Sequence, residues 1–324
     1  LLAALGVVGA AGLRKLFGSV QNAFLRTITE SSRPDVFSSC GVMFIVLVWL
    51  YVLRYALIPE TFYDALLYHL ALPAQYLLHG RINPTPWNSY SGIPALPQML
   101  SGLSLAIEPW GIAASVMHCS ILLWCCVALI GLGRRLGRLQ TGILAAAIFA
   151  STPVVIGESF RVSVGLEWAL MELCCLTVVL AITEEESGPS LPSFIVAGCF
   201  LGFAMATKYP AWLLALAVIP PLAAGRLSTS QERKRLMMRL LALSAIAFIF
   251  ISPWVFKNIF FYGNPLYPFF QEHFAIEGAA MPDWRQISMA GTDLRQWITP
   301  GGLWDYLTHL WKFLKPMEDA SESF

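Results

Sequence analysis

Residues 41–80 read "GVMFIVLVWLYVLRYALIPETFYDALLYHLALPAQYLLHG". The first half is an apolar run long enough to cross a bilayer, and the second half adds a carboxylate, histidines and tyrosines to leucine and alanine. The whole chain has the same bias, since 57% of it is hydrophobic and 13% is charged, against about 25% charged residues in a soluble domain. The sequence therefore predicts an all-α polytopic membrane protein and gives no indication of nucleic-acid binding.

Apolar segments recur along the chain. We expect membrane spans near 41–58, 112–133, 139–157, 162–183, 192–207, 210–225 and 240–257. The apolar run 1–13 is too short to span alone and is expected to be the end of an earlier span, so that about seven to eight transmembrane helices are predicted. The seven cysteines lie in or beside these runs, and their spacing indicates neither a metal site nor a disulfide framework.

Short loops rich in Lys and Arg predict the orientation, because such loops stay on the cytoplasmic side. Three qualify: the one that begins at Arg14, "RRLGR" at 134–138, and "RLSTSQERKRLMMR" at 226–239. Placing all three inside puts the loop 59–111 and Lys208 outside. We therefore expect a multi-pass protein of the cell inner (plasma) membrane with an extracytoplasmic loop at 59–111.

The outer loop contains two further apolar segments, 65–80 and 94–107. If 94–107 crossed the membrane, "RRLGR" would lie outside, so we expect both segments to be juxtamembrane helices at the outer interface. On a helical wheel, one stripe of the first segment collects Asp64, Tyr68, Gln75 and His79. Pro73 is expected to distort the stripe, and His69 lies off it. A plain anchor helix is the alternative interpretation.

Several charged residues at the predicted outer boundary have two interpretations each. Asp64 follows "TFY", so it either lies in the first turn of a helix capped by Thr61 or is catalytic. Lys208 ends a long uncharged stretch and either extends to the headgroups or binds a phosphate. Arg161 either pairs with Glu158 and Glu167 to hold helices together or joins a phosphate site.

Five segments in order resemble the bacterial membrane glycosyltransferases of the GT-C class, which include protein O-mannosyltransferases and aminoarabinose transferases of lipid A. They are "YDALLYHLALPAQYLLHG" from 63, "PWNSYSGIPALPQMLSGL" from 86, "GRRLGR" from 133, "GFAMATKYP" from 202 and "SPWVFKNIFFYGNPLYPFF" from 252. The first segment is similar to the branch with an Asp-x-x-x-Tyr-His-Leu first loop.

The resemblance implies a GT-C-like fold and a set of site residues. The catalytic aspartate of the first outer loop corresponds to Asp64, and the basic residue that meets the donor phosphate corresponds to Lys208. A second acid is expected at the start of the span 162–183, where this chain has Gly165 instead. Glu167, two residues further on, either substitutes for that acid or the site is incomplete.

The function that follows is an inverting transfer of a sugar from a polyprenyl-phosphate donor to an extracytoplasmic lipid, glycan or protein. Asp64 would be the base and Glu167 a second catalytic acid. Substrate-binding candidates are Lys208, His69, Arg161, Tyr68 and Lys257. No cofactor is expected, and a divalent metal ion stays an open alternative. The partners are the lipid-linked sugar and membrane lipids.

Two other functions compete with the transferase. One is an inactive GT-C-like accessory subunit of a larger membrane complex, supported by the missing acid at Gly165. The other is a transporter, against which the spans show few polar residues. Residues 1–270 are expected to form the transmembrane domain. The stretch 271–324 is expected to be an extracytoplasmic, membrane-associated segment, with residues beyond 324 missing.

Overall fold

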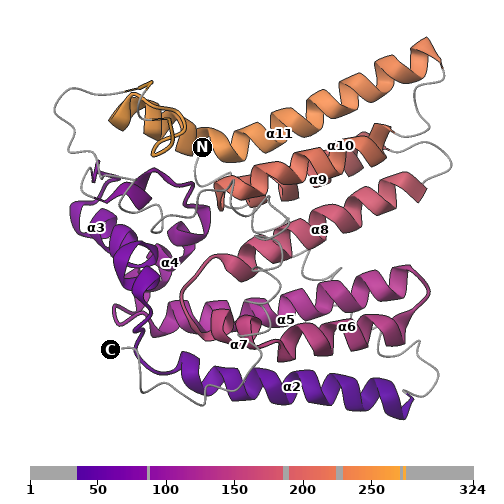
Figure 1. Ribbon diagram of the computed structural model, residues 1–324, viewed down its shortest axis with the longest axis horizontal. Helices are drawn as coiled ribbons and strands as arrows, with labels where there is room; N and C mark the ends of the chain where they lie inside the picture. Colours follow the sequence, from indigo (N-terminus) through magenta and orange to yellow (C-terminus); the bar gives the residue numbers. More distant parts are fainter. Residues whose placement is uncertain (1–34, 86–87, 185–189, 224–228, 271–272, 275–324) are drawn as a thin grey trace, which may run out of the picture.

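The computed structural model describes residues 35–85, 88–184, 190–223, 229–270 and 273–274, which form helices and no strand. Figure 1 shows the long helices running back and forth as an antiparallel array. The predicted span fragment 1–13, the basic loop at Arg14 and almost all of the predicted segment 271–324 lie outside the described residues. The described part confirms the prediction of an all-α polytopic membrane protein.

Within the described residues, four helices are long and apolar enough to cross a membrane. They are α2 (Val36–Ala56), α5 (Ile112–Arg135), α8 (Gly165–Glu184) and α11 (Ser230–Tyr262). Shorter apolar helices run between them: α6 (Leu139–Ser151), α9 (Leu191–Met205) and α10 (Leu214–Ala223), which follows a 3-10 turn at Tyr209–Leu213. Each of the seven predicted spans therefore contains an apolar helix, although three of these helices are short.

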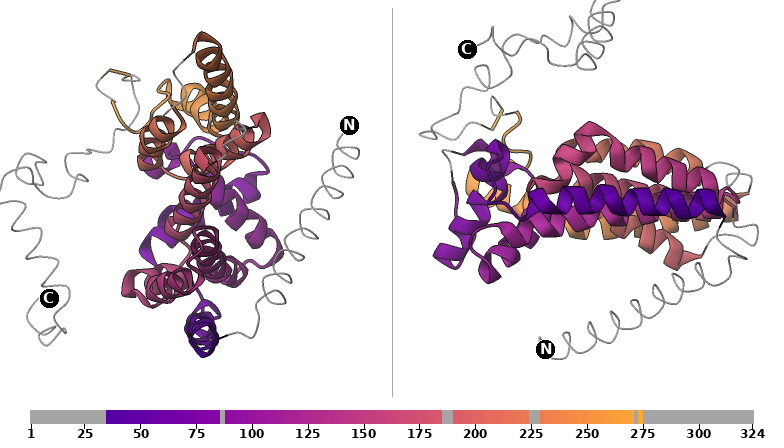
Figure 2. Two further views of the ribbon diagram at one scale, coloured as in Figure 1. Left: turned by 90° about the vertical axis from the view of Figure 1, so that its right-hand side faces the viewer. Right: turned by 90° about the horizontal axis from the view of Figure 1, so that it is seen from below.

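The array has two different ends. The helices α3 (Ala71–His79) and α4 (Leu96–Ile107) gather at one end, as Figures 1 and 2 show. The loop 134–138 and the start of α11, which carry the clusters of Arg and Lys, lie at the opposite end. Segments 65–80 and 94–107 are thus helical, as their sequence predicts, and they cluster together at one end of the long helices.

The predicted span 139–157 is not one helix. It divides into α6 and α7 (Pro153–Phe160), which meet at an angle of 69°. The break falls at Thr152, whose backbone is extended (φ −66°, ψ 127°) because the ring of Pro153 disfavours a helical conformation at the residue before it. Helix α6 alone is about 20 Å long at 1.5 Å per residue. It runs towards the end of the array where α3 and α4 lie, and α7 lies at that end, beyond the bend.

The sequence suggests that the basic stretch 226–239 is a loop, but most of it is helical. Helix α11 begins at Ser230, because the Thr229 hydroxyl accepts the Glu232 N–H while the Glu232 carboxylate accepts the Thr229 N–H. The helix ends at Gly263, whose φ of 62° suits a glycine cap.

The helices approach closely through glycine. Gly198 and Gly202 of α9 face α11, where a Cβ at Gly202 would lie 2.8 Å from the Ala247 Cα. This four-residue spacing of small residues is typical of close helix pairs in membranes. Helix α9 packs between α8 and α11, α5 packs between α6 and α8, and α2 covers α5 and α6.

Candidate active site

The chain leaves α2 and enters a wide π-helical turn at Ala65–His69 before α3 begins. The Leu70 N–H donates to the Ala65 carbonyl, five residues back, at 2.8 Å. The break at Leu70 makes Pro73 the third residue of α3, where a missing N–H costs nothing. The π turn also changes the helix phase, so that both Tyr68 and His69 point inward and are buried, whereas a regular wheel places His69 off the stripe.

Asp64 stands at the start of the π turn and does not cap it. Its Oδ2 instead accepts the Tyr68 hydroxyl at 3.1 Å, and its side chain is half-buried. The cap predicted for Thr61 is absent, because the Glu60 carboxylate accepts the backbone N–H groups of Thr61 and Phe62, each at 2.8 Å. Glu60 thus takes the capping role, which leaves the Asp64 carboxylate to face Tyr68.

The Tyr68 ring is clamped between two neighbours. It stacks on Tyr90 with ring centroids 4.3 Å apart and an interplanar angle of 2°, and it contacts the His69 ring at 4.0 Å. Burial raises the pKa of the Tyr68 hydroxyl, and the Asp64 carboxylate raises it further. Tyr68 therefore remains a hydrogen-bond donor to Asp64 at neutral pH.

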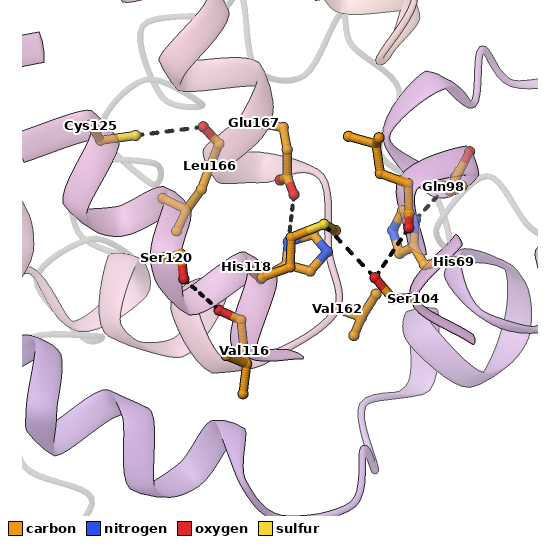
Figure 3. Close-up of polar contacts among 12 residues, drawn as sticks. His69, Gln98, Ser104, Val116, His118, Ser120, Cys125, Val162, Leu166 and Glu167 are labelled. Carbon is orange, nitrogen blue, oxygen red and sulfur yellow. Dashed lines mark hydrogen bonds and ion pairs between the residues drawn. The ribbon is translucent and has the colours of Figure 1, made fainter. Parts of the chain in front are cut away.

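His69 connects this group to α4 and to the interior of the array. Its Nδ1 lies 3.0 Å from Gln98 Nε2, so the amide donates to the imidazole (Figure 3). Burial, together with smaller electrostatic contributions from His118 and Lys208, lowers the pKa of His69 to about 3. His69 is thus neutral at physiological pH and close enough to Lys208 to respond to its charge.

Glu167 is buried at the start of α8 and faces α5. Its Oε1 lies 2.6 Å from His118 Nδ1, an ion-pair distance, and both side chains are almost fully buried (Figure 3). The structure therefore brings Glu167 to His118, a residue that the sequence interpretation missed. A lone histidine in an apolar span carries little sequence signal. The one available signal is that His118 shares a face of α5 with the buried residues Ser115 and Leu122.

Lys208 lies between α9 and the turn at Tyr209–Leu213, with an extended backbone (φ −159°). It is half-buried, and it follows the end of α9 that lies towards α3 and α4 in Figure 1. The Leu96 N–H donates to the Ala206 carbonyl at 3.1 Å, which joins the start of α4 to the residues just before Lys208. The first outer loop therefore packs directly beside this lysine.

The other two basic candidates have defined neighbours. The Arg161 guanidinium lies over the Phe62 ring, 4.8 Å from its centroid, and Arg161 forms no ion pair with Glu158 or Glu167. The predicted ion-pair network at Arg161 is therefore wrong, because the guanidinium stacks on an aromatic ring instead. Lys257 Nζ donates to the Ser91 carbonyl, which holds the loop that carries Tyr90.

A buried polar cluster fixes that loop against α11. The Asn258 amide donates to the Gly92 carbonyl at 2.7 Å, and the Tyr262 hydroxyl lies 2.7 Å from Ser91 Oγ. Gly92 has to be glycine, since a Cβ there would lie 2.6 Å from the Tyr267 carbonyl oxygen. These contacts hold the first loop, and with it Tyr90 and Tyr68, in a fixed position.

Comparison with known protein families gives a match for the central part of the chain. Residues 96–256 match the family described as dolichyl-phosphate-mannose-protein mannosyltransferase. The match confirms the resemblance to GT-C class membrane glycosyltransferases. It includes Glu167 and Lys208 and begins after Asp64 and His69. No curated protein and no solved structure gives a match. The match and the apolar helices together support a multi-pass membrane glycosyltransferase of the mannosyltransferase type.

Proposed function

We propose that this chain is an inverting glycosyltransferase that moves a sugar from a polyprenyl-phosphate donor to an acceptor on the outer side of the plasma membrane. The observation that carries the proposal is the Asp64 carboxylate, which binds the Tyr68 hydroxyl instead of capping a helix. Asp64 directly precedes the π turn that leads into α3, and α3 lies at the end of the array opposite the loop between α5 and α6 (Figure 1). A fixed, half-buried carboxylate in this position suits a general base.

The reaction forms one bond and breaks another. The acceptor hydroxyl oxygen attacks the anomeric carbon of the donor while Asp64 takes its proton. The bond between that carbon and the phosphate oxygen breaks, and the polyprenyl phosphate leaves with the electron pair. Because attack and departure take place on opposite faces of the sugar, the anomeric configuration inverts. Tyr68 orients the base through its hydrogen bond to Asp64 Oδ2.

Lys208 is the cation that we assign to the leaving phosphate. Its half-buried position next to the first loop would place an ammonium group where the dielectric is low, and a fixed cation there stabilises developing negative charge. Neutral His69 would contribute a hydrogen bond without a charge. Lys257 already donates to the Ser91 carbonyl and Arg161 stacks on Phe62, so both are weaker candidates for the phosphate.

The test is transfer by the purified protein in lipid vesicles. Polyprenyl-phosphate donors that carry different labelled hexoses or pentoses are incubated with envelope lipids, glycans and proteins as acceptors. Each reaction is run with a chelator and with added Mg²⁺ or Mn²⁺. We expect label to move to one acceptor class with inverted configuration. If no donor supports transfer, the transferase is rejected in favour of the accessory subunit. The burial of Glu167 against His118 favours that alternative.

A further inference from the structure

Glu158 is an acidic side chain that the proposed reaction does not yet use. It lies on α7, the short helix that follows the bend at Thr152. Helix α7 lies at the end of the array that also holds α3 and α4. It is half-buried, and among the described residues its carboxylate forms no hydrogen bond or ion pair. Arg161, one turn further on, stacks on Phe62 instead of neutralising it.

The Glu158 carboxylate occupies the space directly above Gly165. A Cβ at Gly165 would lie 2.6 Å from Glu158 Oε2 and 3.5 Å from its Cδ, the first of which is closer than a Cβ contact allows. The glycine therefore admits the carboxylate to this place, and any side chain at position 165 would displace it. Since the displaced atom is the end of a flexible side chain, the displacement leaves the fold intact.

The segment that follows Glu158 packs against the segment that precedes Asp64, because Arg161 lies over the Phe62 ring and the Val162 N–H donates to the Glu60 carboxylate. The negative charge of Glu158 is among the causes that raise the pKa of the Tyr68 hydroxyl, after burial, Asp64 and Tyr90. Two carboxylates from separate parts of the chain thus act on one hydroxyl. The Asp64 carboxylate holds this hydroxyl, whereas no donor among the described residues binds either oxygen of the Glu158 carboxylate.

We propose that Glu158 is the second carboxylate of the transfer site, placed there by Gly165, and that it accepts a hydrogen bond from a sugar or acceptor hydroxyl. This rests on the proposed function and deepens it. Carboxylate oxygens without a donor among the described residues, at the same end of the array as the base, suit a polyhydroxylated substrate, because hydrogen bonds to charged acceptors are roughly twice as strong as those to neutral ones. Glu167, buried against His118, is not needed in this role.

The test compares two variants that remove the same carboxylate by different routes. Glu158→Gln removes its charge, and Gly165→Ala displaces it. Each is expected to lower kcat/KM about 10- to 100-fold, the range for a lost charged hydrogen bond. The double variant is expected to be no slower than Glu158→Gln alone, because both changes act on one group. A rise in the KM of the donor or of the acceptor shows which substrate supplies the hydroxyl.

Gly157→Ala is the matched control. Among the described residues, a Cβ at Gly157 would meet Arg161 Nη1 alone, at 4.0 Å. This neighbour of Glu158 therefore accepts alanine, and activity should stay at the wild-type level. Wild-type kinetics for Glu158→Gln would overturn the inference, as would a loss in Gly165→Ala that Glu158→Gln does not share. In either case an active wild-type protein leaves the transferase itself standing. An inactive wild-type protein rejects both together.

Discussion

At the residue scale, Asp64 and Glu108 are carboxylates with different partners. Asp64 binds a tyrosine, whereas the Glu108 carboxylate accepts the backbone N–H groups of Trp110 and Ala113 at the start of α5. The sequence predicts Asp64 as a candidate but leaves capping open, because "TFYD" fits both roles. Glu60 accepts the N–H groups of Thr61 and Phe62 in place of a Thr61 cap. Its carboxylate also accepts the N–H of Val162, which lies 102 residues further along the chain. Such a contact has no local sequence signal.

His69 should make the protein less stable in acid. Its pKa is lowered to about 3 when folded, against about 6.5 unfolded. The neutral form is favoured by folding, so its contribution is complete above pH 6.5 and is lost as the pH falls towards 3. We expect the stability of the wild type to fall relative to His69→Gln, with a slope of up to about 1.4 kcal/mol per pH unit.

The measurement is thermal unfolding in detergent between pH 7.5 and 4.5. The control is His79→Gln, because His79 is exposed at the end of α3 in the same segment. Its unfolding curve is expected to follow the wild type at every pH. Parallel wild-type and His69→Gln profiles would show that His69 does not prefer the neutral form.

Lys208 should act on the donor through its charge. Lys208→Met keeps the apolar stem but removes the ammonium group, and we expect kcat/KM for the polyprenyl-phosphate donor to fall about 10- to 100-fold. Lys208→Arg, which keeps the charge, should retain most of the activity. If Lys208→Met transfers at the wild-type rate, the lysine extends to the lipid headgroups and has no role at the phosphate.

At the element scale, apolar length predicts where helices occur but not how they end or bend. The span 139–157 breaks because Pro153 follows Thr152, and the π turn at Ala65–His69 places Pro73 in the first turn of α3. Both prolines are visible in the sequence. Their effects are not, because a proline can bend, start or end a helix, and the packing around it decides which.

The contact between α9 and α11 should depend on Gly202. A Cβ there would lie 2.8 Å from the Ala247 Cα, and backbone cannot move aside as a flexible side chain can. We expect Gly202→Ala to lower the free energy of unfolding by about 1–3 kcal/mol. A Cβ added at Gly131 in α5 would meet no described atom within 4 Å outside the neighbouring backbone of its own helix. Gly131→Ala should therefore be neutral or stabilising by up to about 1 kcal/mol. Equal stability of the two variants in a denaturant titration would contradict the close contact.

At the scale of the whole molecule, charge and helix direction give one orientation. The basic residues of 134–138 and of early α11 share one end, and the Asp64 segment lies at the other. Parity arguments from the sequence predict this arrangement, because each crossing reverses the side of the chain. They do not predict which side chains meet, and so His118, Tyr90 and Glu158 emerge only from the packing of α5, the first loop and α7.

The sidedness can be measured with single cysteines. In a Cys40→Ser background, which removes the exposed native thiol, His79→Cys should react with a membrane-impermeant maleimide in intact spheroplasts. Arg138→Cys should react only after permeabilisation, because the positive loop stays inside. The reversed labelling pattern would place the Asp64 segment in the cytoplasm, where an extracytoplasmic acceptor cannot reach it.

The most direct measurement is the single-turnover rate of sugar transfer by Asp64→Asn, with Glu108→Gln as the matched control. The asparagine keeps the shape of Asp64 and caps a helix about as well, but it cannot take a proton. We expect the rate to fall about 10²–10⁴-fold at unchanged unfolding temperature, as for the loss of a general base. Glu108→Gln should transfer at the wild-type rate. A wild-type rate for Asp64→Asn would contradict the role of Asp64 as the base.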